Sequence, residues 1–396
     1  MKKLLILGGS QYALPLIKTA HELGIFVITC DYLKDNIAHR YSDIYINESV
    51  TNKRGILKIA KRFKINGITS FACDPGVETM AFVTNKLKLP SVGPYKSVHI
   101  LQNKNLFRKF LKKHGFNTPF YKCVSTKGDL MKVAKTLKYP LIIKPVDSAG
   151  SKGVSKIETP NEIYNAFALA KNNSRSKKVI VEEFLKSVDN PSDSDCYSYK
   201  GKLEFVSFSN QYFDLKSENP YTPAGFIWPS SMELLKQKEI ELELQRLLTL
   251  LKMNTSIYNV ESRYCTNGKT YLMEVSPRGG GNRICEMINL SYGIDLIKRH
   301  VMDCVGINNN EGFQLRQSSR ICEIILHSNE GGTFYNVEID QNGTATLLEK
   351  NIWVKQGDHI DKFCGANKAF GTVIFKIDDK CTYQDICNKI KVINQQ

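Results

Sequence analysis

Apolar residues along the first quarter of the chain alternate between two kinds of spacing. Residues 3–7 and 25–30 are continuous apolar runs with the length of buried strands, whereas residues 11–23 repeat apolar positions at helical spacing until Gly24. A strand, a helix and a second strand in this order indicate a parallel β-α-β unit. The alternation continues in a helix, a strand and a helix that are predicted at 54–63, 67–72 and 77–88. We therefore expect a small open α/β domain over residues 1–96.

Longer helical patterns and alternating strands follow in the middle of the chain. A helix is predicted over 97–114 because its apolar side chains recur on one face before Gly115. Residues 190–195 and 217–225, which are rich in Asn, Asp, Ser and Pro, are interpreted as loops. The remaining predicted elements are strands at 141–144, 179–182, 203–209, 257–263 and 270–276 and helices at 161–171 and 233–251. We assign residues 97–305 to one domain.

After residue 306 the pattern changes to short strands, predicted at 320–326, 333–339, 345–349 and 370–377. Asn342-Gly343 has the chemistry of a two-residue hairpin turn, so the strand at 345–349 is expected to return along the one before it. Residues 306–396 are therefore predicted to form a small, mostly β domain.

Composition agrees with a folded chain of two or three domains. The 396 residues exceed what one hydrophobic core usually serves, and 42% apolar with 24% charged residues exclude a disordered chain. The apolar start Leu4–Leu7 is too short for a signal peptide, and no apolar stretch reaches the roughly 18 residues that span a bilayer. We expect a cytoplasmic protein that does not enter a membrane. Eleven dispersed cysteines without a CxxC pair indicate reduced thiols.

The net charge of +16 comes from lysines that are spread along the whole chain. A basic chain can bind nucleic acid, an anionic membrane or anionic small substrates. No interleaving of aromatic and basic residues accompanies the lysines, so we expect no nucleic-acid partner.

A lysine and a loop of small residues follow one another after the strand at 141–144. Lys144 ends that strand, and the loop spans residues 147–153. Small residues free backbone N–H groups to close over a phosphate, and a lysine at a strand end supplies a fixed cation for it. The phosphate-binding candidates in the loop are Ser148, Gly150, Ser151 and Gly153.

The strand at 179–182 ends in Glu182 and Glu183, with Phe184 and Leu185 directly behind them. A carboxylate at this position can accept a hydrogen bond from an exocyclic amine, and backbone groups can pair with the edge of a ring. We interpret this strand end as an adenine slot.

Glu261 and Glu274 lie on two neighbouring predicted strands. The residues between the strands, 266–268, have turn chemistry, so the strands are predicted to pair as a hairpin. With the two-residue period of a strand, Ser276 shares a face with Glu274. Two neighbouring carboxylates repel each other unless a cation lies between them, and Mg²⁺ prefers carboxylates together with phosphate oxygens. We predict a metal site here.

Arg278 follows Ser276 by two residues and precedes the run Gly279-Gly280-Gly281-Asn282-Arg283. Glycines let the backbone approach a ligand closely, and arginine offers a bidentate fork to a carboxylate or phosphate. This segment is a candidate for binding an anion.

The order of these segments resembles the ATP-grasp superfamily, especially its carboxylate–amine ligases and the branches similar to carbamoyl-phosphate synthetase and phosphoribosylglycinamide synthetase. The resemblance covers roughly residues 1–300 and rests on KNLFRKFLKKHGF, YPLIIKPVDSAGSKGV, VIVEEFL and YLMEVSPRGGGNR. It implies an α/β fold, in part α+β, with an N-terminal Rossmann-like domain and a small β-rich C-terminal domain. Between them it implies a central ATP-grasp domain whose mobile lid spans about 118–185.

The resemblance also implies roles for individual residues. Lys104 and Lys144 correspond to the two nucleotide-binding lysines of the family, and residues 148–153 correspond to its mobile phosphate-covering loop. Arg278 corresponds to the arginine that steadies the acyl phosphate or the transition state, and Lys144 assists it in catalysis.

Residues 182–185 resemble the adenine-binding hinge of the family, and Asp189 is a candidate for the ribose. Glu261 and Glu274 resemble its ligands for Mg²⁺ or Mn²⁺. Ser276 stands where many members carry an asparagine, which leaves open whether it touches a second metal directly or through water.

The implied activity is an ATP-dependent ligation. The enzyme phosphorylates a carboxylate to an acyl phosphate, couples it to an amine, and releases ADP and phosphate. Its partners are then small carboxylates and amines, and a homodimer is left open. Two alternatives remain, an ATP- and bicarbonate-dependent carboxylase that forms carboxyphosphate and a non-catalytic regulator that binds nucleotide.

Overall fold

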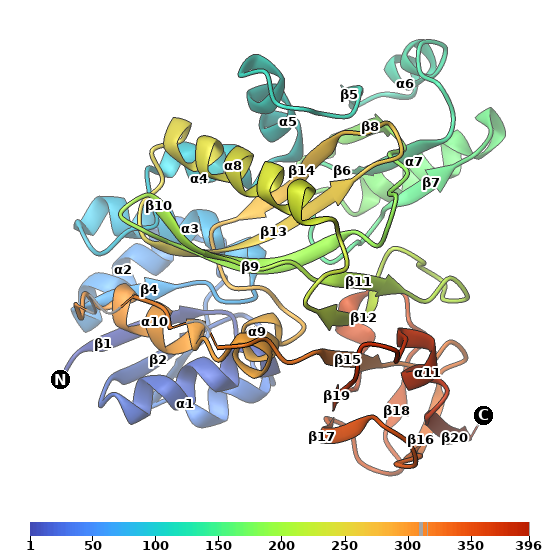
Figure 1. Ribbon diagram of the computed structural model, residues 1–396. Coiled ribbons are helices and arrows are strands. Elements are labelled where there is room, and N and C mark those ends of the chain that lie inside the picture. Colours follow the sequence, from blue (N-terminus) through green and yellow to red (C-terminus); the bar gives the residue numbers. More distant parts are fainter. Residues whose placement is uncertain (309–311, 315, 396) are drawn as a thin grey trace.

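The computed structural model describes residues 1–308, 312–314 and 316–395, and its first region is a parallel sheet of order β3-β2-β1-β4 (Figure 1). The elements of this region are β1 (Lys3–Leu7), the short 3-10 helix η1 (Gln11–Ala13), α1 (Leu14–Glu22), β2 (Phe26–Cys30), η2 (Ile37–Tyr41), β3 (Ile44–Ile46), α2 (Lys53–Phe63), β4 (Gly67–Thr69) and α3 (Asp74–Leu87). β1 pairs in parallel with β2 and β4, which confirms the predicted β-α-β unit. α3 begins at Asp74 rather than at residue 77, because Pro75 fits the first turn of a helix.

The helix predicted over 97–114 is two helices, α4 (Tyr95–Leu101) and α5 (Lys104–Lys113). Asn103 lies between them with an extended backbone, and its Oδ1 accepts a hydrogen bond from the N–H of Leu106 at 3.1 Å. Such a cap satisfies one of the free N–H groups at a helix start. The break places Lys104 in the first turn of α5.

An antiparallel sheet of order β10-β9-β13-β14 lies at the centre of the molecule between α8 and α9 (Figure 1). Its elements are β9 (Ser192–Tyr199), β10 (Lys202–Val206), α8 (Leu234–Leu250), β13 (Ser256–Tyr264), β14 (Thr270–Ser276), α9 (Ile284–Tyr292) and α10 (Leu296–Cys304). The predicted hairpin of β13 and β14 is confirmed. One buried cluster joins Leu244 and Leu247 of α8 to Leu5 of β1, so a continuous core connects this sheet to the N-terminal one.

Two segments that the sequence indicates as loops contain strands. β9 begins inside residues 190–195, and β12 (Pro223–Trp228) begins inside residues 217–225. The polar residues of β9 are buried but have partners, as Ser194 and Ser207 show with hydroxyl oxygens 2.6 Å apart. A polar sequence is stable in a central strand when its side chains are hydrogen-bonded, and composition alone does not reveal this.

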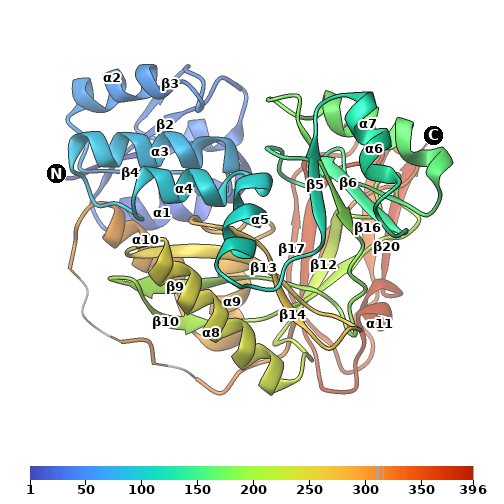
Figure 2. The same cartoon turned by 90° about the horizontal axis from the view of Figure 1, so that it is seen from above.

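The region around the predicted lid forms an antiparallel sheet of order β5-β8-β6-β7. Its elements are β5 (Tyr121–Val124), α6 (Lys127–Ala134), β6 (Leu141–Pro145), β7 (Ser155–Ile157), η3 (Pro160–Glu162), α7 (Ile163–Asn172) and β8 (Val179–Glu183). This region has its own buried apolar cluster, which includes Leu130, Ile143, Phe167 and Val181. Seen from above, the N-terminal region and this region lie on opposite sides of the molecule, with α5 between them (Figure 2). That this region moves as a lid stays a prediction.

The last quarter of the chain contributes to two antiparallel sheets, β11-β12-β15-β19-β17 and β18-β16-β20. The elements are β11 (Asn210–Phe213), β12, β15 (Ile321–Leu326), β16 (Gly332–Ile339), β17 (Thr346–Ile352), β18 (His359–Ile360), η4 (Ala366–Lys368), β19 (Gly371–Lys376), α11 (Tyr383–Cys387) and β20 (Ile390–Gln395). The predicted hairpin at Asn342-Gly343 is wrong, because β16 pairs with β18 and β20 while β17 pairs with β19. Pairing between distant strands overrides the local turn signal here.

Strands from both sides of residue 305 share the five-stranded sheet, since β11 and β12 precede that residue. The division of the chain at residues 96 and 305 stays a prediction. In the part of the chain that the structure describes, no helix is both long and apolar enough to cross a membrane. The eleven cysteines are unpaired in this structure, and five of them are buried.

Candidate active site

Two glutamates face each other on the central sheet. Glu261 on β13 and Glu274 on β14 are directly opposed in the antiparallel register, and a β-bulge follows Glu261. Each side chain is 32% exposed, so neither carboxylate is enclosed in the sheet. Carboxylates at this spacing repel each other unless a cation accompanies them. The fold thus brings the predicted pair together in a position that a ligand can reach.

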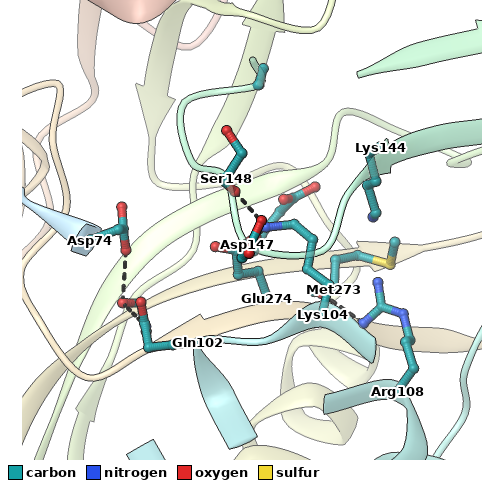
Figure 3. A network of polar contacts seen from close by, with 12 residues as sticks. Asp74, Gln102, Lys104, Arg108, Lys144, Asp147, Ser148, Met273 and Glu274 are labelled. Carbon is teal, nitrogen blue, oxygen red and sulfur yellow. Dashed lines mark hydrogen bonds and ion pairs between the residues drawn. The ribbon is translucent and has the colours of Figure 1, made fainter. Parts of the chain in front are cut away.

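Each of the two glutamates has a basic partner. Lys104 Nζ lies 2.9 Å from Oε2 of Glu274 and donates to the backbone carbonyl of Ser148 at 3.1 Å (Figure 3). Burial lowers the pKa of Lys104, but the charge of Glu274 outweighs this effect and the net shift is upward. Arg263 lies 2.9 Å from Glu261 on the same strand. Burial raises the pKa of Glu261, and the charge of Arg263 reverses that shift.

Glu182 pairs with two further cations, Arg108 and Lys144. The carboxylate is 2% exposed, and Arg108 Nε and Lys144 Nζ each lie 2.7 Å from it. Burial acts to raise the pKa of Glu182, but the charges of Arg108 and Lys144 bring it to about 2. Burial lowers the pKa of Lys144 against the attraction of Glu182. Glu182 therefore fixes the position of the Lys144 ammonium, and its own contact with an adenine stays a prediction.

Sequence reasoning missed Arg108. It is fully buried on α5, and its NH1 donates to the backbone carbonyl of Met273 at 2.8 Å (Figure 3). Arg108 follows Lys104 by four residues, so both point from one face of the helix. That spacing is the signal in the sequence, but the many lysines of α5 conceal it.

Arg278 is held by an aspartate from the N-terminal region. Its Nε and NH2 donate to the two carboxylate oxygens of Asp74 at 2.9 and 2.7 Å, and its NH1 donates to the carbonyl of Gly279 at 3.0 Å. Ser276 Oγ donates to Asp74 at 3.0 Å and accepts from Gln102 at 2.8 Å. Burial raises the pKa of Asp74, but the charge of Arg278 reverses the shift. These contacts use three of the five N–H donors of the guanidinium.

The predicted phosphate loop follows β6. Gly150, Ser151 and Gly153 have left-handed backbone conformations, with φ of 66°, 56° and 74°. Ser151 Oγ donates to the carbonyl of Tyr221 at 2.7 Å, which holds the loop against the segment before β12. The carbonyl of Ser148 accepts from Lys104, so the loop reaches the cations of the site.

The predicted hinge lies at the end of β8. The backbone N–H groups of Glu183 and Phe184 donate to carbonyls of the lid region at 2.9 and 3.0 Å, and Lys156 Nζ lies 4.4 Å from the centre of the Phe184 ring. Leu185 is buried in a small apolar cluster, whereas Asp189 is exposed on the segment between β8 and β9. Residues 183–185 of the hinge follow Glu182 directly at the end of β8. The contact of Asp189 with a ribose stays a prediction.

Two aspartates on β9 were not predicted. Asp193 is directly opposed to Glu261, so carboxylates of β9, β13 and β14 form a row across the sheet. Burial raises the pKa of Asp193 to about 8, and the charges of Glu261 and Asp195 act in the same direction. Asp195 is fully buried and accepts from the backbone N–H of Gly280 at 2.9 Å and from Asn259 Nδ2 at 3.1 Å. The signal for both is the alternation Ser-Asp-Ser-Asp.

Among the residues that the structure describes, no group of three or more His, Cys, Asp and Glu side chains is arranged to hold a metal ion. The described residues offer the two opposed carboxylates of Glu261 and Glu274 instead. The Ser276 hydroxyl already donates one hydrogen bond and accepts another. One or two carboxylates completed by phosphate oxygens and water are the ligand set that Mg²⁺ prefers in proteins.

Residues 101–282 match the family model of the ATP-grasp domain. The formate-dependent phosphoribosylglycinamide formyltransferase of Prochlorococcus marinus is 28% identical over 191 residues, which are 46% of this chain and 48% of that relative. The chain therefore spans about half the length of the curated formyltransferases it matches.

Two solved structures are similar over the whole chain. The L-amino acid ligase from Bacillus licheniformis has a TM-score of 0.80 at 19% identity and covers 100% of this chain and 99% of its own. The phosphoribosylglycinamide synthetase from Anaerococcus prevotii has a TM-score of 0.76 at 22% identity and covers 100% of both chains. At these identities the likeness shows a common fold, and it confirms the predicted fold class.

Proposed function

The chain carries an ATP-grasp domain over residues 101–282, and from that premise we propose that it is an ATP-dependent carboxylate–amine ligase. A carboxylate is a poor electrophile because its charge repels nucleophiles and oxide is a poor leaving group. Transfer of the γ-phosphoryl group of ATP to a carboxylate oxygen forms an acyl phosphate and ADP. Attack of an amine on the acyl carbon then forms the C–N bond, and phosphate leaves. Such a reaction needs positioned charges and no nucleophilic side chain.

The observation that carries this proposal is the pairing of Lys104 with Glu274 and of Arg263 with Glu261. A nucleoside triphosphate bound with a metal ion offers a partner to every member of these pairs. Its phosphates attract Lys104 and Arg263, and its metal ion attracts the two carboxylates. The internal ion pairs can therefore be exchanged for ligand contacts without leaving a buried charge unpaired.

A bound Mg²⁺ or Mn²⁺ would supply positive charge shared between the carboxylates and the phosphate oxygens. Glu261 and Glu274 are the residues that would hold it, with Ser276 beside them on β14. Lys144, kept in place by Glu182, binds a phosphate oxygen. These charges stabilise the transferring phosphoryl group.

Arg278 binds the acyl phosphate as it forms. Asp74 and Gly279 use three of its N–H donors, which leaves the other two for an anion. Because Asp74 comes from the N-terminal region, that region also orients the reacting carboxylate. Asp74 is thus a positioning residue, whereas Arg278 touches the reacting atoms.

The nucleotide base and phosphates are bound by the lid region. The base lies against the hinge formed by residues 182–185, and Asp189 accepts from the ribose. The loop after β6 closes over the phosphates with Ser148, Gly150, Ser151 and Gly153. Left-handed positions in this loop favour backbone N–H groups that converge on an anion.

An ADP-release screen with pooled carboxylic acids and amines tests the proposal. The wild-type chain should release ADP with at least one acid–amine pair, and the release should require both partners. Glu274→Gln should lower that rate by about 100-fold or more while the melting temperature is kept. Glu338→Gln, an exposed position on β16, is the matched control and should keep full activity. An unchanged rate in Glu274→Gln would remove the assigned role of this residue.

The same screen separates the two alternatives. ADP release that depends on bicarbonate and an amine, without any other acid, would identify a carboxylase that forms carboxyphosphate. Binding of ATP without turnover in any pool would identify a regulator. A homodimer stays a prediction, and sedimentation of the full chain measures it.

A further inference from the structure

Glu323 is a fully buried carboxylic acid in the middle of a sheet. It lies on β15 between Phe226 of β12 and Ile374 of β19, and its side chain is 0% exposed. Neither carboxylate oxygen has a hydrogen-bond partner among the described residues. An unpaired polar group in such a place is unfavourable, and an unpaired charge is far more so. Such a residue therefore needs an explanation outside the stability of the fold.

The cation whose charge acts on Glu323 is Arg283, but its donors are engaged elsewhere. Nε and NH2 donate to Glu286 at 3.1 and 2.7 Å, NH1 and NH2 donate to Glu349 at 2.8 Å each, and NH1 also donates to Thr372 at 3.0 Å. These five bonds use all five N–H groups of a guanidinium. Arg283 thus has none left for Glu323 in this arrangement.

The cluster of Arg283, Glu286, Glu323 and Glu349 contains one basic and three acidic side chains. Burial raises the pKa of Glu323 well above its usual range, and the charge of Arg283 opposes this while those of Glu286 and Glu349 add to it. Glu323 can therefore carry its charge only when a second cation enters the cluster. Arg283 is the cation to which the described residues of this cluster are bonded, so a second cation has to come from outside the cluster.

The cluster is open at one end. Glu349 is 39% and Glu286 is 25% exposed, whereas Arg283 is only 10% exposed. A cation that takes Glu349 and Glu286 as partners releases donors of Arg283, and the charge of Arg283 can then balance that of Glu323. This exchange keeps every charge paired, and it explains how a buried acid can serve a ligand that does not reach it.

The cluster is connected to the proposed reaction site by a short stretch of chain. Arg283 follows Arg278 by five residues, so their Cα atoms are at most about 18 Å apart. Between them, Asn282 accepts a hydrogen bond from the Tyr12 hydroxyl at 3.2 Å, and the ring of Tyr12 meets that of Trp353 edge-on at 5.8 Å. Aromatic rings beside carboxylates favour an organic cation.

We propose that Glu286 and Glu349, with Glu323 as the reserve partner of Arg283, bind an ammonium group on one of the two substrates. The inference rests on the proposed ligase function and adds a substrate class to it. The bound ammonium keeps its proton and does not react. The substrate is therefore a compound with a second, charged group, such as an amino acid as the acyl donor or a diamine as the acceptor.

The test replaces that ammonium by a hydroxyl group and keeps the reacting group. Alanine is compared with lactate as the donor, and 1,4-diaminobutane with 4-aminobutanol as the acceptor, in the ADP-release assay with the full chain. The replacement in the correct substrate should lower kcat/KM of the wild type by about 10-fold or more, since a charged hydrogen bond is lost. The arm in which this loss occurs identifies which substrate carries the group.

Glu323→Gln should reduce that discrimination to less than about 3-fold by weakening the binding of the charged compound alone. Its melting temperature should be equal to or above that of the wild type, because an unpaired buried acid is removed. Glu338→Gln is the matched loss of an exposed carboxylate and should keep the wild-type discrimination. Full discrimination in Glu323→Gln, or no discrimination in the wild type in either arm, would overturn the proposal.

A binding measurement separates this inference from the proposed function. Lysine, which carries two ammonium groups, should raise the melting temperature of the wild type by about 2 °C at millimolar concentration and leave Glu323→Gln unchanged. That result in a chain without ADP release would uphold the ammonium site and reject the ligase. The opposite result is ADP release in which Glu323→Gln changes neither the discrimination nor the lysine shift. That result would uphold the ligase and reject the ammonium site.

Discussion

Glu261 on β13 lies directly opposite Glu274 on β14, and each carboxylate is joined to a different cation. The two cations, Lys104 and Arg263, come from different elements, so the pairs can open separately. A ligand that brings both a metal ion and phosphates can replace either pair. The arrangement thus resembles a site whose charges are balanced before the ligand arrives.

Loss of one of the two opposed acids should abolish turnover without harming the fold. Glu261→Gln is expected to lower kcat for ADP release by about 100-fold or more, because one of the two proposed carboxylate ligands is lost. The melting temperature should change little, since the carbonyl oxygen of the glutamine can still accept a hydrogen bond from Arg263. Steady-state rates over a Mg²⁺ titration, together with thermal melts, measure both effects. A variant that keeps both its rate and its Mg²⁺ dependence would contradict the metal assignment.

Loss of Arg108 should destabilise the chain strongly. Arg108→Met leaves the buried carboxylate of Glu182 with one cation in place of two, and we expect a loss of about 3 kcal/mol in the free energy of unfolding. Urea denaturation measures this loss. The double variant Arg108→Met with Glu182→Leu should recover part of it, because no buried acid then remains. Lys109→Met, an exposed neighbour on the same helix, should stay within about 0.5 kcal/mol of the wild type.

Loss of the cap at the start of α5 should weaken both the helix and nucleotide binding. Asn103→Ala removes the acceptor for the N–H of Leu106 and should reduce the free energy of unfolding by about 1 kcal/mol. Because Lys104 follows the cap directly, KM for ATP should rise as well. Asn103→Asp keeps an acceptor at the same place and should retain wild-type stability. Equal effects of the two variants would exclude a capping role.

His300 should make stability depend on pH. Burial lowers the pKa of its imidazole to about 4, against about 6.5 in an unfolded chain. Between these values only the unfolded chain takes up the proton, so stability is complete above pH 6.5 and is lost as the pH falls toward 4. The loss amounts to roughly 3 kcal/mol over that interval.

Urea denaturation at pH 7.5 and pH 4.5 measures this dependence. His300→Gln can keep a hydrogen bond to Thr69, whose Oγ1 lies 2.7 Å from Nε2, and should flatten the pH dependence. His359→Gln is the control, since its side chain is 74% exposed. A slope that survives unchanged in His300→Gln would assign the effect to another group.

The parts of the site that the sequence predicts best are those on regular elements. Glu261 and Glu274 could be paired because their strands alternate cleanly and enclose an Asn-Gly turn. Lys144 could be located because an apolar strand and a glycine loop flank it. In these places local propensity and the final fold point in the same direction.

The parts that were missed depend on partners far away in the sequence. β9 has the composition of a loop, and its buried Ser194 and Asp195 are satisfied only by groups on other segments. Arg108 is one of several basic residues on its helix, and only Glu182, from a distant strand, distinguishes it. The strand after Asn342-Gly343 pairs with β19 and not with β16, so the turn signal led to a wrong pairing.

The position of β12 has a consequence for the synthesis of the chain. Its last residue, Trp228, precedes its neighbour β15, which starts at Ile321, by about 90 residues. A ribosome needs roughly 5 to 20 seconds to add that many residues, and one edge of the β11–β12 hairpin stays unpaired during this time. A chain released early, before β15 is made, would expose the apolar edge Phe226–Trp228 and aggregate. Nascent-chain quality control should therefore act on this protein mainly while the residues between β12 and β15 are being added.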